Sequence, residues 1–119
     1  MANPFVYVQL HTPELKQAQA FYGELFDWRF DEVDTPAGPY VEIRVGDGTA
    51  GGMTALGSEQ GAHWYPYVLV DDIAVATGRA EELGATVVQR PTQLPDKSWF
   101  SVLSDPAGAP LALHQRPGT

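Results

Sequence analysis

The sequence of 119 residues contains no cysteine, which excludes disulfides, thiolate nucleophiles and cysteine-ligated metal sites. Basic residues are also scarce: seven lysines and arginines stand against 15 aspartates and glutamates, giving a formal net charge of −8. A nucleic-acid partner would require a basic surface to replace phosphate counterions, and an anionic membrane would repel this charge. The composition therefore leaves small molecules, or a second copy of the chain, as the expected partners.

Long apolar runs are missing as well. No segment approaches the roughly 20 residues that a membrane helix requires. The N-terminal residues lack the basic and apolar pattern of a secretory signal, so we expect a cytoplasmic protein. What the sequence does contain is 44% hydrophobic residues, enough to fill the core of one domain of this length.

The N-terminal segment alternates with the period of a β-strand. One face of residues 5–11 is apolar and should pack under a helix; it consists of Val6, Val8 and Leu10. The opposite face is aromatic and polar and consists of Tyr7, Gln9 and His11. Helical spacing then predicts an amphipathic helix from about Pro13 to Phe26, with Thr12 as its N-cap. We expect this helix to bury its apolar stripe, which consists of Leu15, Ala18, Phe21, Tyr22, Leu25 and Phe26.

Three further strands are predicted around 28–30, 40–45 and 52–55, separated by turns rich in glycine and proline. The second half of the chain repeats this order. Its expected elements are a strand over 65–70, a helix capped by Asp71 or Asp72 and ended at Gly84, and strands over 86–89, 98–103 and 110–114. The buried side of the second helix should consist of Ile73, Ala76, Ala80 and Leu83.

The two halves align as an internal repeat. A shift of 58 residues without any gap places Leu10 on Val68 and Leu25 on Leu83. We therefore predict an α+β fold of two βαβββ modules with mixed sheets. The modules should cover 5–56 and 63–115, joined by a linker over 57–62, within a single domain of residues 1–119.

Three short motifs then resemble one family in their order and spacing. They are the segment from Ala20 to Trp28 (AFYGELFDW), the VDDI of residues 70–73, and the SDPAGA of residues 104–109. The chain is similar over residues 5–115 to the glyoxalase/bleomycin-resistance/extradiol-dioxygenase (vicinal oxygen chelate) superfamily. The resemblance implies sheets that curl around a cup-shaped ligand pocket, helices outside, and a homodimer.

The resemblance and the strand alternation together give the expected ligand face. A mixed aromatic and polar surface suits a flat, partly polar molecule. The residues that we expect to bind the ligand are Tyr7, Gln9, His11, Thr54, Tyr65, Tyr67, Trp99, Ala112 and His114. An alternative is that the tyrosines only fill a core between the modules.

Catalytic members of the superfamily usually hold a divalent metal with His, Gln or Glu from the first and last strand of each module. The resemblance carries these positions to Tyr7, Thr54, Tyr65 and Ala112. Tyrosine binds metals as a phenolate, which costs about 4 kcal/mol to form at pH 7, and threonine and alanine are poor or absent donors. We therefore predict no metal and no other cofactor.

His11 and His114 remain as candidate catalytic residues. They could perform metal-free acid–base chemistry, or join Glu42 and His63 in a relocated metal site, or serve only as hydrogen-bonded residues at strand ends.

The function that we predict is metal-independent binding of a small aromatic or hydrophobic molecule, as in the bleomycin-resistance-type proteins that confer antibiotic resistance by sequestering a drug. The alternative is a lyase, isomerase or dioxygenase with a relocated metal or none. A third is a subunit that acts through protein contacts, because one scaffold hosts many functions.

Overall fold

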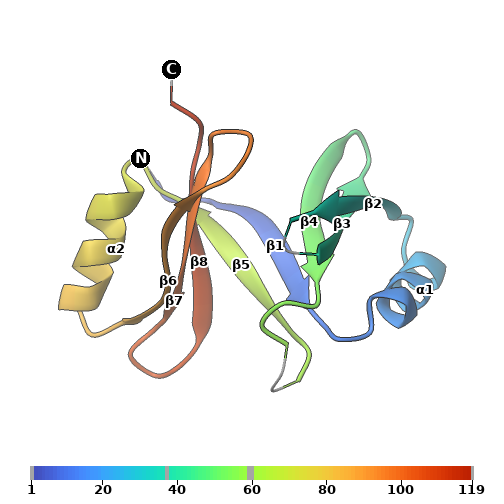
Figure 1. Cartoon of the computed structure of the whole chain (residues 1–119), viewed down its shortest axis with the longest axis horizontal. Coiled ribbons are helices and arrows are strands. Elements are labelled where there is room, and N and C mark those ends of the chain that lie inside the picture. Colours follow the sequence, from blue (N-terminus) through green and yellow to red (C-terminus); the bar gives the residue numbers. More distant parts are fainter. Residues whose placement is uncertain (1, 37, 59–60, 119) are drawn as a thin grey trace. The chain divides into compact units, whose positions relative to one another are not determined.

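A computed structural model describes residues 2–36, 38–58 and 61–118 of the chain. The chain divides into two compact units, residues 7–64 and residues 1–6 together with 65–119. Figure 1 shows a helix beside the strands of each unit. The predicted linker, 57–62, includes residues 59 and 60, which lie outside the described residues, and the module bounds stay a prediction.

The first unit contains one helix and four strands, and its elements follow the predicted order. They are β1 (Phe5–His11, of which residues 5 and 6 belong to the other unit), α1 (Leu15–Leu25), β2 (Arg29–Thr35), β3 (Gly38–Val45) and β4 (Gly48–Thr54). The strands lie in the order β2-β3-β4-β1. β3 is antiparallel to both β2 and β4, whereas β4 is parallel to β1.

The second unit has the same topology. Its elements are β5 (His63–Leu69, of which residues 63 and 64 belong to the first unit), α2 (Ile73–Glu82), β6 (Thr86–Gln93), β7 (Trp99–Ser104) and β8 (Pro110–Gln115). The strands lie in the order β6-β7-β8-β5, with β8 parallel to β5 and the other pairs antiparallel. The predicted α+β fold of two βαβββ modules with mixed sheets is confirmed.

The prediction that the repeat needs no gap was wrong. The helices begin 58 residues apart, at Leu15 and Ile73, but the last strands do not keep this offset. Gln9 lies opposite Gly52, whereas its counterpart Tyr67 lies opposite Ala112, which is 60 residues beyond Gly52. The β6–β7 pair has register shifts that the β2–β3 pair lacks, and its connection has five residues where that of β2–β3 has two.

The two helices begin differently. Helix α1 begins at Leu15 rather than Pro13, and its N-cap is Glu14, which makes no side-chain capping hydrogen bond. The prediction of Thr12 as the N-cap was wrong: its hydroxyl accepts from the backbone N–H of Glu14 at 3.1 Å, before the helix begins. Asp72 caps α2 as predicted, because its Oδ1 accepts from the backbone N–H of Val75 at 3.1 Å. Gly84 follows α2 with a φ of +104°, a conformation that glycine adopts at little cost.

The core of the first unit lies between α1 and the sheet. Its buried residues are Leu10, Val41, Ile43 and Met53, with Leu15, Ala18, Tyr22, Trp28, Phe30 and Trp64 packed against them. The expectation that Phe21, Leu25 and Phe26 are buried was wrong: Phe21 and Leu25 are each 58% exposed and Phe26 is 44% exposed. The apolar stripe of α1 is wider than the strip of helix that contacts the sheet, so one flank stays in solvent.

The core of the second unit is partly polar. Val70, Ile73, Leu103 and Leu113 are buried, and Ala76 and Ala80 pack against them as predicted. The buried Thr77 hydroxyl donates to the Ile73 carbonyl at 2.6 Å and lies 2.9 Å from the Ser101 hydroxyl, which joins α2 to β7. Leu83 was expected in this core but is 66% exposed, because it is the C-cap residue beyond the last buried turn.

Among the described residues, no helix is long and apolar enough to cross a membrane.

Candidate functional site

The polar face of the first unit is built by three neighbouring strands. His11 on β1 lies opposite Thr54 on β4, and Thr54 lies opposite Tyr40 on β3. Because alternate residues of a strand share a face, Tyr7 and Gln9 lie on this face too. Four of the predicted ligand residues, Tyr7, Gln9, His11 and Thr54, are thus brought together.

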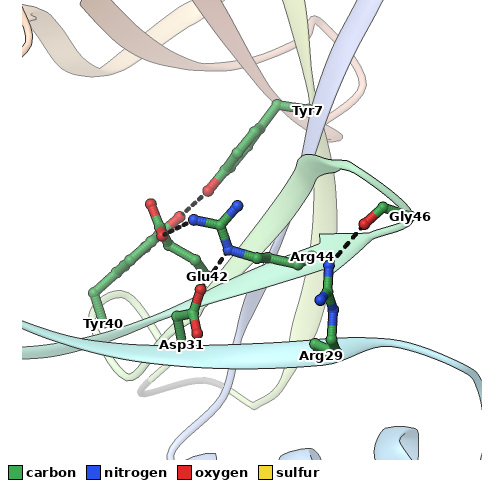
Figure 2. Close-up of polar contacts among 7 residues, drawn as sticks. All are labelled: Tyr7, Arg29, Asp31, Tyr40, Glu42, Arg44 and Gly46. Atoms are coloured by element: carbon green, nitrogen blue, oxygen red, sulfur yellow. Dashed lines mark hydrogen bonds and ion pairs between the residues drawn. The ribbon is translucent and has the colours of Figure 1, made fainter.

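A chain of hydrogen bonds runs along this face. The hydroxyls of Tyr7 and Tyr40 are hydrogen-bonded to each other, as Figure 2 shows. The Tyr40 hydroxyl also donates to Gln9 Oε1 at 3.0 Å, and Gln9 Nε2 lies 3.2 Å from His11 Nε2. His11 Nδ1 lies 2.6 Å from the carbonyl oxygen of Leu56. We call Tyr7, Tyr40, Gln9 and His11 the Tyr–His chain.

Gly52 makes room for the two tyrosines. A Cβ atom at this position would lie 1.8 Å from the Tyr40 hydroxyl oxygen and 2.7 Å from that of Tyr7. Both distances are far below van der Waals contact, so the tyrosine hydroxyls can lie against the strand only because residue 52 has no side chain.

Burial shifts the pKa values of His11 and Tyr7, the two ends of the Tyr–His chain. His11 is buried, and burial lowers its pKa, opposed by the hydrogen bond to Leu56; the nearby His63 lowers it further. The rings of His11 and His63 are stacked, with centroids 5.1 Å apart. Burial raises the pKa of Tyr7, its hydrogen bond with Tyr40 lowers it, and the charge of Glu42 raises it. His11 is therefore held as a neutral imidazole and Tyr7 as a neutral phenol at neutral pH.

Charged side chains lie near Tyr7, at one end of the Tyr–His chain. Glu42 lies on β3 two residues from Tyr40, and its Oε1 is 3.8 Å from Arg44 Nη2. Arg44 Nε is also bonded to Asp31, so one guanidinium faces two carboxylates (Figure 2). On the neighbouring strand, Arg29 donates to the carbonyl of Gly46 at 2.8 Å.

The second unit carries four more of the predicted ligand residues, Tyr65, Tyr67, Ala112 and His114, on β5 and β8. Tyr67 lies opposite Ala112, and His114 follows two residues later on the same face. The rings of Tyr65 and Tyr67 are stacked with centroids 5.8 Å apart, and burial raises the pKa of Tyr65. Burial lowers the pKa of His114, whereas the charge of Asp96 raises it and that of Arg116 lowers it.

Trp99 does not share this face, contrary to expectation. It packs against the core cluster of Val70, Ile73, Leu103 and Leu113 on the helix side. Phe100, the next residue of β7, lies opposite His114 instead. The alternation of β7 places Trp99 with the buried Ser101, and Phe100 on the opposite face, beside His114.

The sequence reasoning missed Tyr40 and Phe100 and considered Glu42 only as a metal ligand. A signal for Tyr40 was present, since Val41 and Ile43 are apolar and alternate with Tyr40, Glu42 and Arg44. Phe100 gave no such signal, because β7 has apolar residues on both faces.

The residues present do not fit the divalent metal that the family implies. The raised pKa values of Tyr7 and Tyr65 make their phenolates harder to form. Gln9 and His11 are already hydrogen-bonded to each other. Within residues 2–36, 38–58 and 61–118, no three His, Asp or Glu side chains gather in a group that could hold a metal ion.

An apolar pocket of about 270 Å³ lies in the first unit, on the opposite, helix-facing side of β1. It is lined by Val8, Trp28, Ile43, Val45, Ala50, Gly51 and Trp64. None of the predicted ligand residues contributes to it. Val8, which was expected to pack under the helix, is 41% exposed at this pocket.

Comparison with known proteins gives both sequence and structural relatives. Residues 6–114 match the family described as glyoxalase-like domain. A protein of Mycobacterium tuberculosis and Mycobacterium bovis, "Putative glyoxylase CFP32", is 31% identical over 106 residues. The match covers 87% of this chain but only 41% of that protein, so this chain spans less than half the length of the relative.

Two solved structures show the same fold at low sequence identity. The protein BH1468 of Bacillus halodurans has a TM-score of 0.72 at 14% identity, over 100% of this chain and 98% of that one. A glyoxalase/bleomycin resistance protein/dioxygenase superfamily member from Vibrio splendidus has a TM-score of 0.65 at 13% identity, over 92% and 95%. With its family match over residues 6–114, the chain belongs to the glyoxalase-like domain family of the glyoxalase/bleomycin resistance/dioxygenase superfamily.

Proposed function

We propose that the protein binds a small aromatic or hydrophobic molecule without a metal, in the manner of bleomycin-resistance-type drug-sequestering proteins. The observation that carries this proposal is the Tyr–His chain. Side chains on the first-strand face, where metal-dependent relatives hold their ion, are here neutral and hydrogen-bonded to one another. Such a surface offers flat aromatic rings and oriented polar atoms, which suit recognition of a flat, partly polar molecule.

Calorimetric titration with a panel of polycyclic aromatic compounds, in buffer containing a metal chelator, tests the proposal. At least one compound should bind, and Tyr7→Ala should weaken it by about 1–3 kcal/mol, as truncating a buried aromatic contact does. Phe21→Ala is the matched control, because it removes an exposed aromatic ring of α1 and should leave binding unchanged.

Failure of the whole panel to bind would contradict the proposal. So would binding that the chelator abolishes, or a large, saturable rise in melting temperature when Zn²⁺ or Mn²⁺ is added.

A second candidate function is metal-free acid–base catalysis by His11. Its Nδ1 is 2.6 Å from the Leu56 carbonyl, which fixes the Nδ1–H tautomer, and its Nε2 would act as the base once the Gln9 amide, 3.2 Å away, gives way to a ligand. The name of CFP32 agrees with an enzyme, although that protein is more than twice as long. Deuterium uptake from D₂O at the carbon next to a bound ligand's carbonyl, lost in His11→Asn, would favour this candidate.

We further propose that the chain forms a homodimer, as the resemblance implies. Light scattering coupled to size-exclusion chromatography should give twice the 12.9 kDa mass of the chain. A mass of one chain at micromolar concentration would contradict the proposal.

A further inference from the structure

The apolar pocket of the first unit is shaped by a bulge in β4. Ile43 on β3 lies opposite Gly51. The next residue, Arg44, lies opposite Thr49, so Ala50 is the extra residue of a β-bulge. Ala50 and Gly51 both line the pocket, although regular alternation would put two successive residues on opposite faces of the strand. The bulge therefore turns the two smallest lining residues toward one space.

Two tryptophan rings line the same pocket, and Tyr22 holds both of them. The ring centroids of Trp28 and Trp64 are 6.5 Å apart, and the ring planes meet at 74°. Tyr22 stacks on Trp28 with centroids 5.7 Å apart, and its hydroxyl accepts a hydrogen bond from Trp64 Nε1 at 3.2 Å. Because both rings are already fixed, a ligand that packs on them costs little further ordering of side chains.

The lining determines the chemistry of the ligand. All seven lining residues are apolar, and the indole N–H of Trp64 is used on Tyr22. A charged group in this pocket would lose its water without meeting an opposite charge on any lining residue, which is unfavourable. Aromatic rings, in contrast, can pack edge-to-face or stacked on the two indoles. The pocket therefore favours an uncharged aromatic ligand.

The size of the pocket favours a small molecule over a protein partner. An apolar cavity of about 150 Å³ holds benzene, so the volume of about 270 Å³ suits two or three aromatic rings. Val8 at the rim is 41% exposed, so a ligand can enter from solvent. A stable protein interface takes roughly 20–30 residues a side, whereas seven line this pocket. A second copy centred here by two-fold symmetry would place hollow against hollow and leave a void.

We propose that this pocket is a separate binding site, which takes an uncharged aromatic molecule of two or three rings. All of its lining residues belong to the first unit, and none of them belongs to the Tyr–His chain. The inference therefore goes beyond the proposed function and does not depend on it.

Phenylnaphthylamine and anilinonaphthalenesulfonate are a matched pair of probes, because the second is the first with a sulfonate added. Both become fluorescent in an apolar environment, so titration followed by probe emission measures their binding. The uncharged probe should bind at least about tenfold more tightly than the sulfonate, since the pocket offers the anion no partner.

Two variants fill the pocket from neighbouring strands. Ala50→Leu should weaken binding of the uncharged probe by about tenfold or more, because the new side chain occupies space that the probe needs. Ala50 is exposed and its φ is negative, so the backbone accepts leucine. Val8→Phe fills the pocket from β1 and should have the same effect. Ala74→Leu is the matched control, since it makes the same change at an exposed position on α2 and should leave binding unchanged. Circular dichroism confirms that each variant is folded.

The outcomes separate this site from the Tyr–His chain. Loss of binding in Tyr7→Ala, with none in Ala50→Leu or Val8→Phe, would place the probe on the Tyr–His chain; the proposed function would stand and the inference would be wrong. Equal or tighter binding of the sulfonate, or no binding of the uncharged probe, would also overturn it. So would a change in the mass of the protein in solution caused by Ala50→Leu without any effect on the probe, because the pocket would then be a contact between copies.

Discussion

Val8 and Leu10 share the apolar face of β1 but differ in what covers them. Leu10 is 4% exposed and packs with Val41, Ile43 and Met53, whereas Val8 is 41% exposed at the rim of the apolar pocket. The two positions are indistinguishable by strand alternation. Only the position of α1 over one end of the sheet separates them.

Truncation of these two residues should therefore have unequal effects. Leu10→Ala should lower the free energy of unfolding by about 2–5 kcal/mol, because it removes a buried side chain and leaves a cavity. Val8→Ala should cost less than about 1 kcal/mol, because the lost methyl groups are half in solvent. Urea unfolding followed by circular dichroism measures both, and equal losses would mean that Val8 is covered in solution.

At the residue scale, the sequence predicted which side chains share a strand face where one physical rule was enough. Alternation alone placed Tyr7, Gln9 and His11 on one face, and the structure joins Tyr7 to Gln9 through Tyr40. That joining residue comes from a strand 31 positions away, so no local pattern could show the contact.

At the scale of the element, β4 carries two adjacent glycines that serve different purposes. A Cβ on Gly51 would lie 2.1 Å from the carbonyl oxygen of Val8, which belongs to the backbone of the paired strand. A Cβ on Gly52 would meet the hydroxyl ends of two tyrosine side chains. A side chain can rotate away, but a paired backbone cannot move without breaking the ladder.

Gly51→Ala should therefore destabilise the protein by about 1–3 kcal/mol through overpacking, and Gly52→Ala by less. Gly52→Ala should instead displace Tyr40 and weaken ligand binding while the fold survives. Thermal unfolding and calorimetric titration of both variants provide the comparison. The opposite ranking of stabilities would contradict the assignment of Gly51 to backbone packing.

The order of the elements could be predicted from the sequence, but their exact register could not. Strand alternation, the Asp72 cap and the Gly84 terminator are local signals, and each is found where predicted. The offset of the last strand accompanies the register shifts of the β6–β7 pair and its longer connection, residues 94–98, which no periodicity constrains. The width of the apolar stripe on α1 likewise gives no indication of how much of it the sheet covers.

At the scale of the whole molecule, the buried His11 and the partly buried His114 link stability to pH. Burial lowers the pKa values of His11 and His114 in the folded protein, whereas unfolded histidine titrates near 6.5. As the pH falls below about 6.5, the unfolded chain binds protons that the folded chain does not, so unfolding becomes more favourable.

The free energy of unfolding should therefore fall as the pH is lowered from about 6.5 toward 5, and should be insensitive to these two groups above that range. Asp96 and Asp105, whose pKa values are lowered by hydrogen bonds from Ser98 and Ala109, act only at more acidic pH. Urea unfolding at several pH values tests the slope. The double variant His11→Asn/His114→Asn should flatten it, and an unchanged slope in that variant would contradict the assignment.

The absent side chain at residue 52 also constrains how this protein can evolve. The hydroxyls of Tyr40 and Tyr7 occupy the space in which a Cβ of residue 52 would lie. A descendant that acquires alanine at 52 while keeping Tyr40 loses the existing arrangement, whereas one that first loses Tyr40 can accept alanine afterwards. The order of the two substitutions therefore matters, and relatives that carry a larger residue at this position should have a smaller one at the position of Tyr40.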